Sequence, residues 1–238
     1  MSTSFPAAGD VASDDYFLSY SSYQALPFLY TRQDYTWDAD APNDQDWQYS
    51  YATIESANIV LDALPTISGI TAADENTIRG AALFFRGYAL AQLTAIFTLP
   101  YDAANAATLP GMPLRTSSDI TVKTTRANMA ATYQQVISDL KAAAALLPVQ
   151  PLVRTRPSKP AAFGALARLY LDMGDFASAG AYADSCLQLY STLIDYNTVS
   201  TSAHTPFTRF GPEVIFHATQ QGQPRYGAVP RTHRHEPI

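Results

Sequence analysis

Aromatic rings and short polar side chains gather in the first fifty residues. The chain has 238 residues with 15 tyrosines and 2 tryptophans. Seven of these rings fall between residues 16 and 47: Tyr16, Tyr20, Tyr23, Tyr30, Tyr35, Trp37 and Trp47. Flat rings stack on the apolar faces of sugars, and carboxylates and amides hydrogen-bond to sugar hydroxyls. The composition of this segment therefore favours carbohydrate binding.

One loop within this segment is the predicted binding site. It runs from Tyr35 to Asp44, just before a predicted helix that would anchor its base. The residues predicted to bind ligand are Tyr35, Trp37, Asp38, Asp40 and Asn43. Trp37 lies off any helical stripe, so it is the predicted stacking platform. Trp47 lies on a helical stripe and is predicted to be structural.

The sequence contains no Gly-x-Ser-x-Gly, phosphate-loop or His-Glu-x-x-His motif, so we predict a non-enzyme without a cofactor. The acids of the loop at 38, 40, 44 and 46 could coordinate Ca²⁺, but the loop glycine and distal Glu of an EF-hand are missing, which favours a solvated acidic loop. His233 and His235 stand in a polar tail, and no metal site is predicted. The only cysteine, Cys186, is predicted to be a small buried hydrophobic residue.

Charge is distributed unevenly along the chain. The net charge is −6, yet residues 1–78 carry twelve acidic side chains and one basic side chain, Arg32. An acidic first third argues against nucleic acid and anionic membrane surfaces as partners. We find no apolar run long enough for a bilayer and no signal peptide.

Hydrophobic periodicity predicts an all-α fold with irregular loop inserts. The predicted helices are near residues 47–64, 72–98, 125–147, 159–173 and 175–190. Thr124 or Thr125 is the expected cap of the third helix. The proline-rich insert at 99–124 is predicted to be a loop, and 214–216 a short strand.

Residues 158–190 read as a helical hairpin of the tetratricopeptide type. Its features are Leu166-Ala167, Tyr170, and Gly174-Asp175 followed by an aromatic residue and alanines. Gly174 is expected to take the left-handed conformation that ends a helix. One such unit cannot bury its apolar face alone, so neighbouring helices must cover it.

Ten short segments, spread over about 200 residues, form a series with a characteristic order and spacing. They are Ser13-Asp14-Asp15, Trp47 through Tyr51 with Ile54 and Ala57-Asn58, Ile78-Arg79-Gly80, Ala82 to Tyr88, Leu99-Pro100-Tyr101, Pro113-Leu114, Tyr133 to Leu140, Leu147-Pro148, Lys159 to Leu171, and Glu213 to Phe216. In this order and spacing they resemble the SusD/RagB family, surface glycan-binding lipoproteins of Bacteroidetes. The resemblance implies a tetratricopeptide-type scaffold with an irregular ligand-binding face that binds glycan and does not cleave it.

The same resemblance implies partners and a location. The ligand would be an oligosaccharide or polysaccharide, and the partner a SusC-like TonB-dependent transporter. The protein would sit at the cell outer membrane as a surface-exposed lipoprotein, held by a lipid on an N-terminal cysteine. That cysteine and its signal are not in this sequence, since Cys186 is internal.

Members of the family are roughly twice this long. Residues 1–216 would therefore be the N-terminal part of the family fold, followed by an irregular tail at 217–238. A second hypothesis rests on the hairpins alone. It is a tetratricopeptide-type scaffold that binds a protein or peptide and no sugar.

Overall fold

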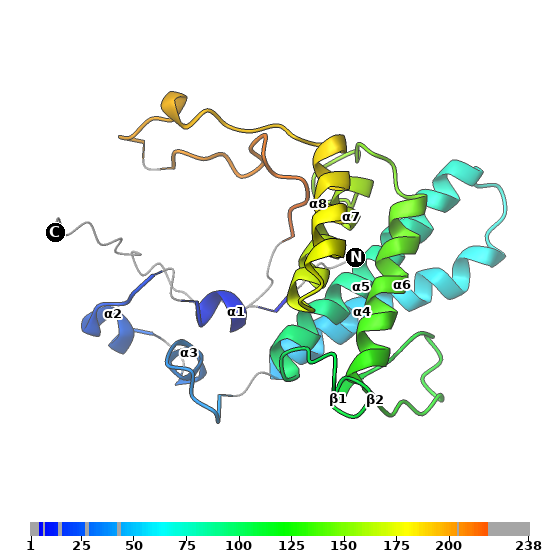
Figure 1. The fold of residues 1–238 in the computed structure, drawn as a ribbon, viewed down its shortest axis with the longest axis horizontal. Coiled ribbons are helices and arrows are strands. Elements are labelled where there is room, and N and C mark those ends of the chain that lie inside the picture. The colour runs from blue at the N-terminus through cyan, green and yellow to red at the C-terminus, as the bar shows by residue number, and fades with distance from the viewer. Residues whose placement is uncertain are drawn as a thin grey trace.

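Helices make up most of the chain, as Figure 1 shows for the computed structural model. The structure describes residues 5–6, 8–13, 16–26, 29–41, 44–203 and 205–218. It is 54% helical, with two short strands in the described part. The predicted all-α fold is confirmed. The predicted tail lies almost entirely outside the described residues.

Five long helices form an array in which each packs against the next (Figure 1). They are α4 (Asp44–Ala63), α5 (Ala72–Phe97), α6 (Met129–Leu146), α7 (Lys159–Asp172) and α8 (Phe176–Leu189). Every predicted helix end is confirmed to within three residues, except the start of α6.

Shorter elements flank and connect the array. They are α1 (Ala8–Val11), α2 (Tyr20–Gln24), α3 (Leu29–Tyr35), the 3₁₀ turns η1 (Leu64–Thr66) and η2 (Tyr196–Thr198), and the strands β1 (Pro110–Pro113) and β2 (Arg126–Asn128). The segments before α4 and after α8 both extend from the same side of the array in Figure 1. They supply the irregular parts of the fold.

The predicted start of α6 at residue 125, capped by Thr124 or Thr125, is wrong. The chain first forms β2, which pairs antiparallel with β1 inside the insert predicted to be all loop. Arg126 reinforces this pairing, since its Nε donates to the Gly111 carbonyl at 2.6 Å. The helix then begins at Met129, and the Asn128 side chain accepts from the Ala131 N–H at 2.8 Å as its cap. A short ladder with a distant partner carries little local signal, so periodicity alone placed the helix start too early.

The core lies where α5 and α6 meet. Phe84, Phe85 and Leu93 of α5 are almost fully buried against Leu140 of α6. Gly87 makes the close approach possible, because a Cβ there would lie 3.0 Å from the Cβ of Asp139. Gly80 lies at a second close approach, because a Cβ there would lie 3.0 Å from Cγ of Leu147, just after α6.

Helix α5 is apolar enough to be compared with a membrane span. By length and composition alone it could cross a bilayer, contrary to the expectation from the sequence, but 56% of its most apolar window is buried inside the array. The burial fits a central core helix. Its apolar length serves the contacts with α4 and α6.

The chain after α8 returns to this core without forming the predicted strand at 214–216. Phe216 instead packs its ring on Phe84, with the ring centres 5.0 Å apart. From the other end of the chain, Phe5 meets Tyr88 at 4.9 Å. Aromatic packing on α5 therefore ties both irregular segments to the array.

The hairpin of α7 and α8 forms as predicted. Gly174 has φ 73°, the left-handed conformation, and the Asp175 side chain caps α8 by accepting from the Ser178 N–H at 3.0 Å. Cys186 is buried, and its thiol donates to the Pro160 carbonyl at 3.2 Å. Burial raises the pKa of the Cys186 thiol, which fits the predicted structural role.

Candidate functional site

The predicted ligand loop begins at the C-terminal end of α3. The N–H of Trp37 donates to the Asp34 carbonyl at 3.2 Å, and the N–H of Asp38 donates to the Gln33 carbonyl at 2.9 Å. This pair of bonds is the Schellman closure of a helix. The closure places Trp37 at the position that requires a left-handed backbone.

Trp37 is unusual at that position. Its φ is 58°, and among the described residues other than glycine no other has a positive φ. Its indole is 76% exposed. A left-handed backbone costs a residue with a Cβ roughly 1–2 kcal/mol, and an exposed indole recovers little of that by burial. Strain of this kind concentrates at functional sites.

Asp38 and Asp40 form the turn that follows. The Asp38 carboxylate accepts from the Asp40 N–H at 2.9 Å and from Gln33 Nε2 at 3.4 Å, which fixes its position beside Trp37. Both carboxylates are exposed. Asn43, the fifth predicted residue, lies outside the described residues. The structure thus puts an indole and two carboxylates on one short turn.

Tyr35 sits at the base of the loop. Its hydroxyl accepts from the Leu18 N–H at 2.9 Å, and its ring lies 5.8 Å from Tyr16 and 6.0 Å from Tyr23. These contacts hold α3 against the segment before it. A ligand contact of Tyr35 stays a prediction.

The acids of this region do not converge. Asp46 is buried and accepts from the Ala8 N–H at 3.0 Å, which links α1 to α4. Among the side chains that the structure describes, no three of the His, Cys, Asp and Glu residues come together as metal ligands. Trp47 is half-buried and packs edge-on to Phe97 at 5.1 Å, as a structural residue would.

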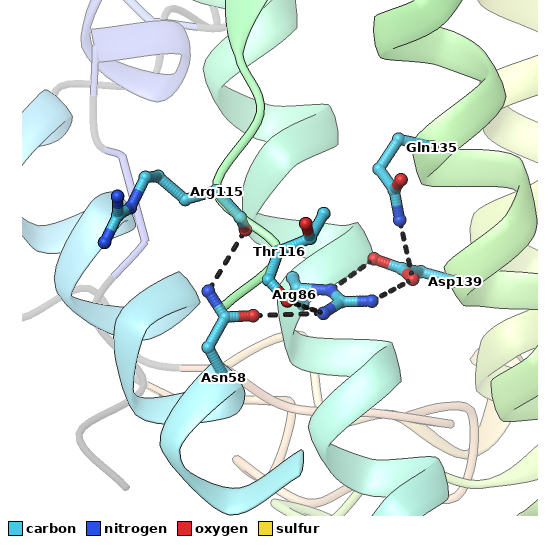
Figure 2. Close-up of polar contacts among 6 residues, drawn as sticks. All are labelled: Asn58, Arg86, Arg115, Thr116, Gln135 and Asp139. Atoms are coloured by element: carbon cyan, nitrogen blue, oxygen red, sulfur yellow. Dashed lines mark hydrogen bonds and ion pairs between the residues drawn. The ribbon is translucent and has the colours of Figure 1, made fainter. Parts of the chain in front are cut away.

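Within the helical array, a buried polar network joins several elements (Figure 2). Arg86 donates to both carboxylate oxygens of Asp139, at 2.8 and 2.7 Å, and to Asn58 Oδ1 at 3.0 Å. Asn58 donates in turn to the Arg115 carbonyl at 3.1 Å, and Gln135 donates to Asp139 at 3.0 Å. The network joins α4, α5, α6 and the loop after β1. Its charges are paired within the protein, so its role is structural.

Comparison with known proteins identifies the family. Residues 4–171, well over half of the chain, match the SusD-like family described as "Starch-binding associating with outer membrane". The chain belongs to this family. No curated protein matches the sequence.

Solved structures of SusD-like proteins share the fold. A putative sugar binding protein from Bacteroides vulgatus is 30% identical, with a TM-score of 0.61 over 67% of this chain and 36% of that one. A SusD superfamily protein from Bacteroides thetaiotaomicron is 28% identical, with a TM-score of 0.62 over 69% and 38%. One from Bacteroides fragilis, at 18% identity, has a TM-score of 0.69 over 88% and 48%. The chain spans less than half the length of each.

The polar network lies within the part of the chain that matches the SusD-like family. Asn58, Arg86 and Asp139 all fall within the segments that carried the sequence resemblance, yet sequence analysis gave them no role. A signal was present, because Arg86 follows Phe84-Phe85 on an otherwise apolar stretch. A charge on the apolar face of a predicted helix requires a buried partner.

Proposed function

We propose that this SusD-like protein binds a glycan without cleaving it, at the turn formed by Trp37, Asp38 and Asp40. The observation that carries the proposal is Trp37, an exposed indole held in a strained backbone conformation. The indole offers a flat face to a sugar ring, and the two carboxylates beside it accept from sugar hydroxyls. Tyr35 at the base of the loop and Asn43, which lies outside the described residues, belong to the proposed site as predicted from the sequence.

The family and one relative support a carbohydrate as the ligand. The family description names starch, and the Bacteroides vulgatus relative is described as a putative sugar binding protein. From these we also propose a setting. The protein would act at the outer-membrane surface as a lipoprotein and deliver glycan to a SusC-like TonB-dependent transporter, with residues 1–216 as the N-terminal part of the binding unit and 217–238 as a tail.

Binding to a glycan array that includes maltoheptaose tests this proposal. Trp37→Ala should weaken binding by roughly 30-fold, about 2 kcal/mol, as expected for a central stacking ring. The matched control is Tyr20→Ala, which removes an equally exposed ring from α2 and should leave affinity unchanged. The proposal fails if Trp37→Ala stays folded and binds glycan as tightly as the unchanged chain.

A second function is favoured by the outer side of α8. Phe176 and Leu187, eleven positions apart and so on one face of the helix, are exposed there, which suits a tetratricopeptide-type scaffold that binds a protein. This alternative predicts no signal for any glycan on the array together with saturable binding of the transporter. Substituting Leu187 with Asp would then abolish transporter binding, whereas Trp37→Ala would not.

A further inference from the structure

A groove runs along α5 on the side that faces α7. It consists of two adjoining cavities of about 370 and 730 Å³. Both are lined by Tyr88, Gln92, Ala95 and Arg168, so the two cavities adjoin along α5. We call this space the α5 groove. None of the residues predicted for the loop site lines it.

Rings form much of the wall. In the smaller cavity Tyr101 and Tyr133 meet edge-on, with their centres 4.7 Å apart, near Tyr88. In the larger cavity Phe5 and Phe216 pack against Tyr88 from the two ends of the chain. The groove is thus assembled only when both irregular segments dock on α5.

Several polar groups of the groove have no hydrogen-bond partner within the described part of the chain. Tyr133 is 7% exposed, and its hydroxyl makes no hydrogen bond there. Neither the Gln92 amide nor the Arg168 guanidinium is hydrogen-bonded in that part. Nδ1 of His217 is buried without a partner. Of these groups His217 Nδ1 is buried, so it carries a cost of roughly 1–3 kcal/mol that a bound molecule would offset. Arg168 is exposed and Gln92 is half-buried, so both are open to a ligand that replaces water.

The charges of the groove nearly cancel. Arg168 and Asp172 lie one turn apart on α7, and both line the smaller cavity. Partial burial raises the pKa of the Asp172 carboxyl, and Arg168 opposes that shift. Burial raises the pKa of Tyr133, with Asp172 adding to it. The tyrosine therefore stays a neutral hydroxyl at physiological pH, able to donate and accept.

We propose that the α5 groove is a second binding site, for a neutral oligosaccharide, distinct from the turn at Trp37. The ligand class rests on the proposed function, and the site rests on the groove itself. Ring faces suit the apolar faces of pyranoses, and the hydroxyl, amide and guanidinium groups suit their polar rims. Each of the two cavities falls in the range of small-molecule sites, roughly 300–1,000 Å³.

Tyr133→Phe is the sharpest variant, because it removes one unpartnered hydroxyl and keeps the ring that packs the core. It should leave the melting temperature unchanged. The measurement is calorimetric titration of the full chain carrying Trp37→Ala, with maltoheptaose, a xylogluco-oligosaccharide and a manno-oligosaccharide as probes. Tyr133→Phe should lower the remaining affinity about five- to tenfold, as loss of one hydrogen bond does. Tyr196→Phe, at an exposed hydroxyl remote from the groove, should not.

The outcomes separate the two sites. Binding that disappears entirely with Trp37→Ala overturns the groove site and leaves the proposed function intact. Binding that survives Trp37→Ala and weakens with Tyr133→Phe supports the groove site. Equal residual binding in Tyr133→Phe and Tyr196→Phe overturns the groove site. If none of the three probes binds the unchanged chain, the groove site is overturned and the proposed function lacks support as well.

Discussion

Helices α3 and α7 end with the same pattern of backbone hydrogen bonds but with opposite residues at the decisive position. At the end of α7, the N–H of Gly174 donates to the Leu171 carbonyl at 3.0 Å, and the N–H of Asp175 donates to the Tyr170 carbonyl at 2.9 Å. The end of α3 repeats this arrangement with Trp37 in place of the glycine. The first end is built for stability. The second retains a strained, exposed ring, which is understandable if the ring binds something.

The surroundings of the two ends differ as well. The end of α7 belongs to the helical array, in which the Arg86 network joins α4, α5 and α6, whereas the end of α3 lies in the segment that precedes the array (Figure 1). A rigid array beside a lightly attached loop is a common arrangement of binding proteins. The stability of the two regions should therefore respond to different substitutions.

The largest effect should come from the array. Arg86→Ala leaves the buried Asp139 carboxylate without its partner, which typically costs 3–5 kcal/mol. Urea unfolding measures the loss. The matched control on the same helix is Arg79→Ala, which breaks a half-exposed pair with Glu75 at 2.6 Å and should cost about 0.5 kcal/mol or less. Equal losses in the two variants would mean that the network is not what holds the array.

A smaller effect on stability is expected at Gly174, which ends α7. A Cβ at Gly174 meets nothing within 4 Å, so Gly174→Ala tests the backbone alone. It should lower the free energy of unfolding by about 1–2 kcal/mol, since alanine disfavours positive φ. Gly180→Ala, inside α8 and equally uncrowded, should instead raise it by roughly 0.5–1 kcal/mol. A higher free energy of unfolding in both variants would contradict a left-handed backbone at Gly174.

Most helices and the glycine end of α7 could be predicted from the sequence, because helix periodicity and glycine at a helix end are local signals. The Gly174 turn and nearly all helix ends were placed correctly on that basis. The start of α6 was not, because β2 depends on pairing with residues of β1 that lie 13 to 18 positions earlier (Pro113 with Arg126, Pro110 with Asn128). The Arg86–Asp139 pair joins residues 53 apart, so spacing alone did not connect them.

For the site, sequence placed Trp37 correctly as an exposed ring off the helical stripes, but could not foresee its backbone. Tryptophan is not a residue that local rules put in a left-handed position, so nothing in the sequence marked α3 as closing there. The α5 groove could not be predicted from the sequence either. Its walls come from Phe5, α5, α7 and Phe216, which only the folded chain brings together.

The most direct test of the account is Trp37→Gly, with stability and glycan affinity measured on the same preparation. Glycine removes the strain and the ring together. The account predicts a slightly more stable protein, by about 0.5–1 kcal/mol in urea unfolding, that binds glycan roughly 30-fold more weakly. A variant that is less stable, or that binds glycan as well as the unchanged chain, would contradict the claim that Trp37 is held in strain for binding.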